Sequence, residues 1–168
     1  WPLHGGGSGG GVVVHEHSVY IANDGLHCIQ VYGLDGSFQR QFGTRGSGPG
    51  QFKSPYGLAL SDEKELYVSD IGNHRVQVFG LDGSHVRSHV RSWGSEGEEE
   101  GEFSGPYGLA VDEECVYVCD AYNHRVQVFG LDGTFQRMWG SEGAGEGEFQ
   151  YPQHAIVQGE LLYVSDSL

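Results

Sequence analysis

The stretch that decides the fold is residues 66–83, LYVSDIGNHRVQVFGLDG, because it returns almost unchanged as VYVCDAYNHRVQVFGLDG at residues 116–133. A weaker copy runs through residues 19–36, and a fourth begins at residue 162 and holds only the first part of the pattern. The aligned tyrosines of the four copies, Tyr20, Tyr67, Tyr117 and Tyr163, lie 47, 50 and 46 residues apart. The longest spacing contains a four-residue tandem duplication, SHVR, at residues 84–91.

Each repeat predicts four short strands that are separated by turns. In the second repeat we expect strands at residues 57–60, 66–69 and 75–79, and a fourth that ends at Trp93. The pair Asp82-Gly83 suits a tight hairpin turn, and no apolar period of 3.6 residues appears, so helices should be nearly absent. A β-sandwich would not repeat its sequence this closely, and a parallel β-helix has shorter coils.

Four-stranded units that repeat every roughly 40–50 residues are typical of β-propeller blades. The predicted fold class is therefore all-β, an incomplete β-propeller of about three and a half blades. The expected segments are a Gly-rich connector from an upstream repeat (1–11), three blades (12–54, 55–105 and 106–151) and the first two strands of a fourth blade (152–168).

Composition and charge exclude several classes of function. Lys and Arg number 9 against 23 Asp and Glu, which gives a net charge of −14. Binding to nucleic acid or to an anionic membrane requires clustered cations, so neither is expected. The longest apolar run, residues 12–14, is far too short to span a bilayer.

The cysteines bear on the cellular compartment. Cys28, Cys115 and Cys119 form no CxxC pair and no even framework, so a disulfide scaffold is not expected. Buried free cysteines are typical of reducing compartments. The expected localisation is therefore cytoplasmic, although the chain begins at Trp1 and a targeting segment could precede it.

Three motifs recur along the chain: Pro-Tyr-Gly-Leu-Ala at residues 55–59 and 106–110, Tyr-Val-(Ser/Cys)-Asp, and Asn-His-Arg-Val-Gln-Val-Phe. Together they resemble the NHL repeat family. The resemblance implies a β-propeller, commonly one of six blades. The first repeat departs from the pattern, with Asn23, Leu26 and Cys28 in place of Asp, Asn and Arg, and in the fourth repeat Gln153 and His154 replace Tyr and Gly.

The resemblance also implies functions. NHL propellers often end multidomain chains, including RING-type ubiquitin ligases, in which they choose the substrate; no RING cysteines occur here. Similar propellers include metal-dependent enzymes, namely an amidating lyase and lactonase-type hydrolases, so an enzyme of this kind remains the alternative. Family members that bind RNA use a positively charged face, which the acidic charge of this chain does not favour.

Two sets of polar residues resemble catalytic groups but recur as copies. They are Asp70, Asn73 and Arg75, and Asp120, Asn123 and Arg125. A catalytic group is needed once, whereas a blade corner is built in every blade. An Asp at a strand end can accept hydrogen bonds from turn N–H groups and from Arg. We expect these residues to be structural, and Asp120→Ala to cost about 1–3 kcal/mol.

The topology of an up-and-down meander places the corners and the connectors between blades at one end. His74 and His124 lie on the corners, and the connectors run through residues 43–55, 94–106 and 140–152. The first connector carries Arg45 and Lys53, whereas the others are acidic: Glu96, Glu98, Glu99, Glu100 and Glu102, then Glu142, Glu146 and Glu148. We expect a non-catalytic scaffold that presents this face to a protein or peptide of basic character. Simple solvation of the loops and weak cation binding are the alternatives.

His154 is the one non-repeated histidine at the start of an innermost strand, which lines the channel of a propeller. It could supply one imidazole to an axial metal, but three or four ligands from different blades would be required. His15 and His17, which alternate on one face of an expected strand, are weaker candidates. We expect no catalytic residue and no cofactor. Unpaired strand edges also predict self-association.

Overall fold

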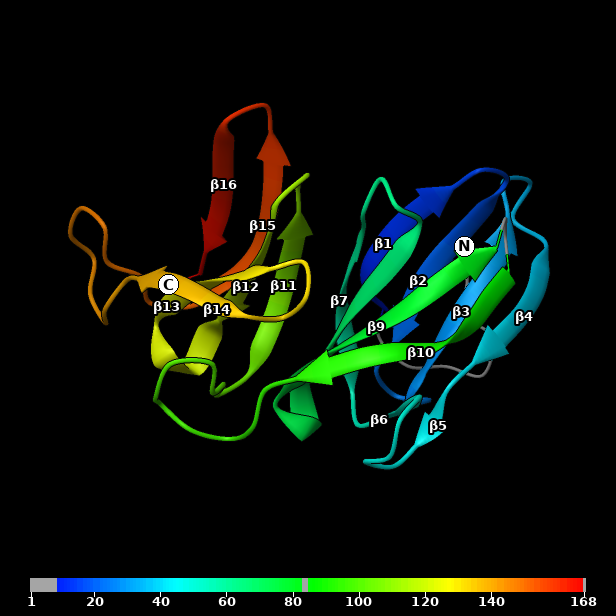
Figure 1. Ribbon diagram of the computed structural model, residues 1–168, viewed down its shortest axis with the longest axis horizontal. Coiled ribbons are helices and arrows are strands. Elements are labelled where there is room, and N and C mark those ends of the chain that lie inside the picture. The colour runs from blue at the N-terminus through cyan, green and yellow to red at the C-terminus, as the bar shows by residue number, and fades with distance from the viewer. Residues whose placement is uncertain (1–8, 83–84, 168) are drawn as a thin grey trace.

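The computed structural model describes residues 9–82 and 85–167. Three four-stranded antiparallel sheets and one two-stranded sheet follow one another around an open arc (Figure 1). The first sheet holds β1 (Gly9–His15), β2 (Ser18–Asn23), β3 (Cys28–Gly33) and β4 (Phe38–Phe42). The second holds β7 (Pro55–Leu60), β8 (Glu65–Asp70), β9 (Arg75–Asp82) and β10 (His85–Trp93).

The third sheet holds β11 (Pro106–Val111), β12 (Cys115–Asp120), β13 (Arg125–Gly130) and β14 (Phe135–Trp139), and the last pairs β15 (Pro152–Gln158) with β16 (Leu161–Asp166). Strands β5 (Thr44–Arg45) and β6 (Gln51–Phe52) form a short parallel ladder within the first connector. Two single-turn 3-10 helices, η1 (Ile71–Asn73) and η2 (Ala121–Asn123), form the corners. The prediction of an all-β propeller is confirmed.

Aromatic side chains fill the space between successive blades. Phe52, from the first connector, lies with its ring centroid 5.7 Å from that of Phe79 on β9, and Phe103 stands 5.5 Å from Phe129 on β13 in the same way. Phe52 and Phe103 are completely buried. A Cβ atom at Gly94, which has a positive φ of 104°, would lie 2.6 Å from the Phe103 ring. In each connector a phenylalanine ring therefore packs directly against a glycine, in the space between two sheets.

The first strands of the blades run side by side along the inner side of the arc, and glycine permits their close approach. A Cβ atom at Gly57 would lie 2.4 Å from the carbonyl oxygen of Tyr107, and one at Gly108 would lie 2.4 Å from that of Gln153. Gly10 approaches Tyr56 in the same way. Residues 9–11 consequently belong to β1 and not to the expected connector, whose residues 1–8 lie outside the described residues.

The tandem duplication lengthens the β9–β10 hairpin. Strand β10 pairs with β9 through two one-residue register shifts, between Val86 and Ser88 and between His89 and Arg91. Beyond them Arg91 pairs with Val78 as Arg137 pairs with Val128 in the third blade. The two shifts add up to an even number of residues, so the strand beyond them keeps its faces.

The cysteines are all buried and free. Burial raises the pKa of the Cys119 thiol to about 12 and also raises that of Cys28. In the part of the chain that the structure describes, no helix has the length and apolar character needed to cross a membrane.

Candidate functional site

The corner of the third blade is a buried hydrogen-bond network around one carboxylate. Asp120 is completely buried. Its Oδ1 accepts from the backbone N–H of Ser104 (2.7 Å), and its Oδ2 accepts from Asn123 Nδ2 (2.8 Å), Arg125 Nε (2.8 Å) and Gln127 Nε2 (3.1 Å). Burial raises the pKa of the Asp120 carboxyl, while these donors stabilise its ionised form.

The second blade repeats the network. Asp70, equally buried, accepts from Lys53 N (2.7 Å), Asn73 Nδ2 (2.8 Å), Arg75 Nε (2.9 Å) and Gln77 Nε2 (3.1 Å). The matching distances indicate that the two corners have the same role. A structural role fits two identical copies, whereas a catalytic group is needed only once.

The remaining donors of each corner hold the connector that enters the blade. Arg125 donates from its Nη atoms to the carbonyl oxygens of Glu98 (2.6 Å), Glu99 (3.0 Å) and Glu102 (2.9 Å), and Asn123 donates to that of Gly97. Arg75 binds the carbonyls of Ser47, Gly48 and Gln51 in the first connector. The connectors are therefore fixed in position by their backbone.

The corner histidines are half-buried and lie against the corners and connectors. His74 and His124 adopt the left-handed conformation, with φ of 51° and 53°, and each ends its 3-10 helix by donating its backbone N–H to the residue three before it. His124 Nδ1 lies 2.6 Å from the carbonyl oxygen of Gln150 in the third connector. In the first blade His27 Nδ1 accepts from Ser54 N at 3.0 Å.

The glutamates of the connectors divide into two kinds. Exposed side chains belong to Glu96, Glu98, Glu99, Glu100, Glu142 and Glu146. Glu148 is also exposed, but it and the half-buried Glu102 brace their own loops, since Glu148 Oε2 accepts from Gly145 N (2.8 Å) and Glu102 Oε2 from Glu99 N (3.2 Å). Gln51 makes the matching bond to Gly48 N in the first connector.

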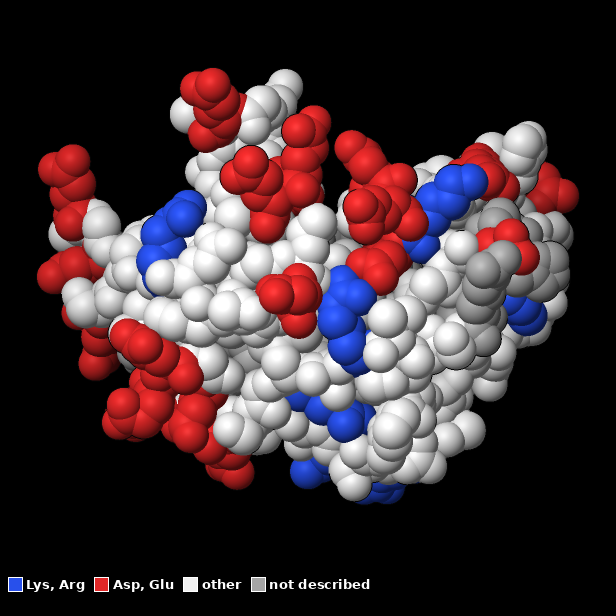
Figure 2. Space-filling view, in the orientation of Figure 1, with Lys and Arg blue, Asp and Glu red and all other residues white. Residues whose placement is uncertain are grey.

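Acidic side chains gather at both ends of the blades, not at the connector end alone. Figure 2 shows carboxylates at the upper and at the lower left margin of the molecule. The end opposite the connectors holds the turns between the first and second strands, which carry Asp62, Glu63, Asp112, Glu113, Glu114 and Glu160. Charge alone therefore does not distinguish the connector face.

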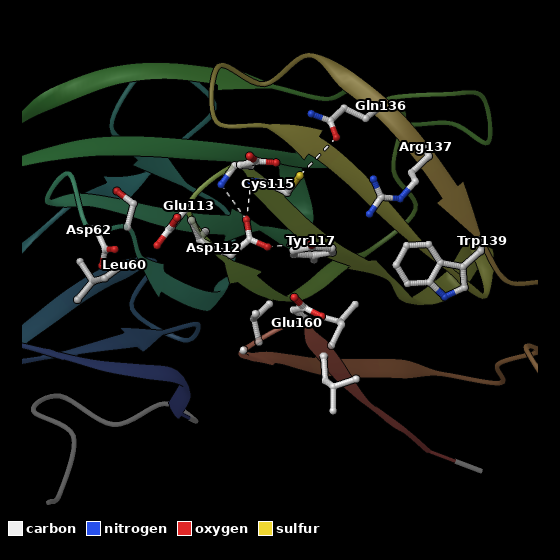
Figure 3. A pocket seen from close by; sticks show the side chains of 17 residues that line it. Leu60, Asp62, Asp112, Glu113, Cys115, Tyr117, Gln136, Arg137, Trp139 and Glu160 are labelled. Carbon is white, nitrogen blue, oxygen red and sulfur yellow. Dashed lines mark hydrogen bonds between the residues drawn. The ribbon is translucent and has the colours of Figure 1, made fainter.

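A hollow of about 970 Å³ opens at the end that carries these turns, between the third and fourth sheets (Figure 3). Asp112 Oδ1 accepts there from the N–H groups of Glu114 and Cys115, and its Oδ2 accepts from the Tyr117 hydroxyl. Burial opposes ionisation of Asp112, but these three donors outweigh it and lower the pKa. Burial and the bond to Asp112 raise the pKa of Tyr117 to about 12.

Arg137 and Trp139 line the same hollow, and their counterparts explain its origin. One blade earlier Arg91 Nε donates to the carbonyl oxygen of Leu131 (3.0 Å), and Trp93 packs 5.7 Å from Phe129. Leu131 and Phe129 belong to β13 and the turn that follows it. Between the second and third sheets, the corresponding space is thus filled by β13 and the turn after it. Between the third and fourth sheets, the same space is the hollow.

Four tyrosines form a continuous row on the connector side, and we call them the tyrosine row: Tyr56, Tyr107, Tyr122 and Tyr151. Successive ring centroids are 5.1, 5.9 and 5.2 Å apart. The hydroxyl oxygens of Tyr107 and Tyr122 are 3.2 Å apart. One-residue bulges between Pro55 and Leu58 and between Pro106 and Leu109 turn the strand at Tyr56 and Tyr107.

The row contains residues that break the repeat. Tyr122 stands where the second blade has Gly72, and Tyr151 stands where the preceding connectors have Ser54 and Gly105. Gly105, with φ of 74°, leaves room for the neighbouring ring, since a Cβ atom there would lie 2.2 Å from Tyr122 Cδ2. Tyr122 and Tyr151 were not expected from the sequence, although their departure from the repeat was a signal that could have revealed them.

Two phenols of the row, those of Tyr107 and Tyr151, have a raised pKa. Burial, followed by the hydrogen bond that its hydroxyl shares with that of Tyr122, raises the pKa of Tyr107 above its ordinary value. Burial also raises the pKa of Tyr151, with Tyr122 contributing in the same direction. At these two positions the row therefore offers ring faces and hydroxyl dipoles, not phenolate charge.

Tyr122 also lines a second, shallow pocket of about 600 Å³ on the connector face. Glu98 and His124 contribute to it, and β14 closes its outer side with Met138 and Trp139. This pocket brings together two residues expected at the partner face, Glu98 and His124, with a tyrosine that was not expected.

The metal candidates are not brought together. Among residues 9–82 and 85–167, no group of three or more His, Cys, Asp or Glu side chains could hold a metal ion. His154 is exposed, and its ring lies 5.7 Å from that of Tyr56, with Nε2 3.5 Å from the Tyr56 hydroxyl. His15 Nε2 lies 3.8 Å from Glu16, and His17 is exposed.

Comparisons with known proteins agree with this architecture. Residues 52–79 match the model of the NHL repeat, and residues 96–168 match a family described as a 6-bladed beta-propeller. No curated protein matches the chain.

Solved structures of similar fold include a nidogen/laminin complex (20% identity, TM-score 0.72, 97% of this chain and 57% of that one). A streptogramin B lyase is similar at 13% identity, with a TM-score of 0.69 over 94% of this chain and 48% of that one. A gluconolactonase from Xanthomonas campestris is similar at 19% identity, with a TM-score of 0.67 over 95% and 54%. The chain spans about half the length of these proteins, and identities this low show the fold alone.

Proposed function

Because the chain is built of NHL-type β-propeller blades, we propose that it is a non-catalytic scaffold that binds a protein or peptide of basic character. The binding surface is the connector face, formed by residues 94–106 and 140–152 with the corners that hold them. In a longer protein, such as a ubiquitin ligase, this face would serve to recognise the substrate.

The observation that carries the proposal is the fixed position of the acidic second connector. Arg125 binds three of its carbonyl oxygens, so the exposed carboxylates of Glu98, Glu99 and Glu100 project from a backbone that is already ordered. A preorganised loop loses less conformational entropy when a partner binds. Exposed carboxylates attract a basic partner and increase its association rate.

The fold comparison supports a binding role by analogy. The propeller with the highest TM-score named above belongs to a nidogen/laminin complex, an assembly between proteins. A similar fold hosts enzymes as well, namely the lyase and the gluconolactonase. Fold does not decide between these roles, so the proposal rests on the connector face.

The test is a reversal of charge with a control of equal size. We expect the triple variant Glu98→Lys, Glu99→Lys, Glu100→Lys to fold normally, because the three side chains are exposed. It should weaken binding of an eight-residue peptide of alternating Arg and Gly by at least about tenfold at low salt. Calorimetric titration measures the affinity, and circular dichroism checks the fold.

The control reverses three exposed carboxylates at the opposite end, Asp62→Lys, Glu63→Lys and Glu113→Lys, and so changes the net charge equally. We expect it to retain most of the affinity. Equal losses in both triple variants would reduce the effect to net charge and contradict a binding face. Affinity that is insensitive both to the first triple variant and to salt would also contradict the proposal.

A further inference from the structure

We infer that the pocket beside Tyr122 is the receptor for an arginine side chain of the partner, with Tyr122 as the ring beneath the guanidinium and Glu98 as its carboxylate. This inference rests on the proposed function and names the side chain that the connector face would recognise. It differs from the general attraction between charges because it depends on an aromatic surface.

The pocket has the composition that a guanidinium requires. Tyr122 is 47% exposed, although it lies at the centre of an aromatic cluster, and it shares the pocket with the carboxylate of Glu98. The walls added by Met138 and Trp139 are apolar or aromatic and could contact the aliphatic stem of the side chain. A cation over an aromatic ring, beside a carboxylate, combines two attractive interactions.

Arg125 also borders the pocket, but its own charge is already satisfied. Its Nε donates to the buried Asp120 carboxylate, and its Nη atoms donate to three backbone carbonyls. Its side chain is only 8% exposed. The positive charge that faces the pocket is therefore paired, and among the described residues the Glu98 carboxylate has no ion-pair partner, so it is available to the partner protein.

The ring of Tyr122 is held in place before any partner binds. The Tyr107 hydroxyl lies 3.2 Å from its own hydroxyl, and the Tyr151 ring stands against it at 86°. Gly72 occupies the same corner position in the second blade, so the fold of the corner does not need a side chain there. A residue that the corner does not need, but that its neighbours hold rigidly, is suited to recognition.

Arginine fits this arrangement better than lysine. A planar guanidinium can lie flat on the phenol ring and present a fork of N–H donors to one carboxylate, whereas an ammonium is a strongly hydrated point charge. We therefore expect the alternating Arg-Gly peptide to bind more tightly than a matched Lys-Gly peptide of the same charge.

The experiment compares both peptides on the complete chain and on two variants. Tyr122→Ala should weaken binding of the Arg-Gly peptide by about fivefold to tenfold and change that of the Lys-Gly peptide less. Tyr122→Phe keeps the ring and should keep most of the affinity. Tyr163→Ala removes a tyrosine of similar exposure, 50%, from β16 and should leave both affinities unchanged.

The outcomes separate this inference from the proposed function. If the Arg-Gly peptide binds and depends on Glu98, Glu99 and Glu100, but Tyr122→Ala binds it as the unaltered chain does, the arginine receptor is wrong and the connector face remains the proposed binding surface for a basic partner. Equal losses for the two peptides would also overturn it. If neither peptide binds the unaltered chain, the proposed function itself fails.

Discussion

At the scale of single residues, one buried carboxylate at the corner of the second blade, and one at that of the third, links three parts of its blade. Asp120 joins the strand β12, the arginine of β13 and the incoming connector through four hydrogen bonds. Because Asp70 does the same in the second blade, the pattern Asp…Asn-His-Arg is a device for attaching connectors. The Asp, Asn and Arg of this pattern can be recognised in the repeated sequence. Their partners in the connector are backbone N–H and carbonyl groups, which only the structure identifies.

We expect Asp120→Ala to destabilise the fold by about 3 kcal/mol, because it leaves the nearly buried guanidinium of Arg125 without its charge partner. Asp70→Ala should behave alike. Urea unfolding followed by circular dichroism measures the change, with Asp35→Ala, which removes an exposed turn carboxylate, as the control. Equal stabilities for Asp120→Ala and Asp35→Ala would contradict the assignment.

At the scale of elements, the lengthened hairpin β9–β10 is tied both to its own blade and to the next. Arg91 donates from Nη1 to Glu65 Oε1 (2.9 Å) and from Nη2 to Glu65 Oε2 (2.6 Å), and its Nε reaches the carbonyl oxygen of Leu131 in the third blade. The hydrogen bonds from Arg91 are the main reason why the pKa of Glu65 is lowered, although burial opposes them.

This pair predicts a stability that depends on pH. A carboxyl whose pKa is lower in the folded state contributes stability above its unfolded pKa, about 4.3, and loses that contribution as the pH falls through its folded value. At pH 7 Glu65→Gln should therefore cost about 1 kcal/mol, a modest figure because the pair is partly exposed to solvent. The difference from the unaltered chain should shrink towards pH 3.

Thermal unfolding at pH 7 and at pH 3 measures this dependence, with the exposed Glu63→Gln as control. A loss for Glu65→Gln that is the same at both pH values would mean that packing, and not the ionised pair, is responsible.

Element by element, the sequence predicted the strands well and the aromatic surface poorly. The aligned repeats located all four strands of the second blade, because alternation and turn pairs are local signals. The boundary near Gly10 was misjudged, since the need for glycine there comes from the close approach of the next blade at Tyr56. The tyrosine row depends on bulges and on contacts between blades, neither of which a single strand pattern reveals.

At the scale of the whole molecule, the sheets form an open arc (Figure 1), and apolar side chains are exposed on the sheets at both of its ends. Val12 on β1 is 58% exposed, whereas Leu58, its counterpart in the second blade, is 7% exposed. Tyr163 on β16 is 50% exposed, whereas Tyr67 is fully buried. The equivalent positions in the inner blades pack against neighbouring blades. Self-association, which the sequence predicts, stays a prediction, and the exposed faces of β1 and β16 are the surfaces at which we expect it.

The whole molecule also presents two acidic ends. The proposed function requires that a basic partner bind the connector end and not the opposite one. The connector end combines fixed loops with the tyrosine row, whereas the opposite end combines acidic turns with the hollow at the third and fourth sheets. The affinity of the unaltered chain alone cannot separate the two ends, because both attract cations.

The most direct test is therefore a map of the binding surface. Amide chemical shifts of the labelled chain, followed by NMR during titration with the Arg-Gly peptide, report which residues the peptide approaches. We predict shifts concentrated in residues 94–106, 121–124 and 140–152. Shifts concentrated instead in the turns at residues 61–64, 112–114 and 158–160 would contradict the connector face as the functional surface of this propeller.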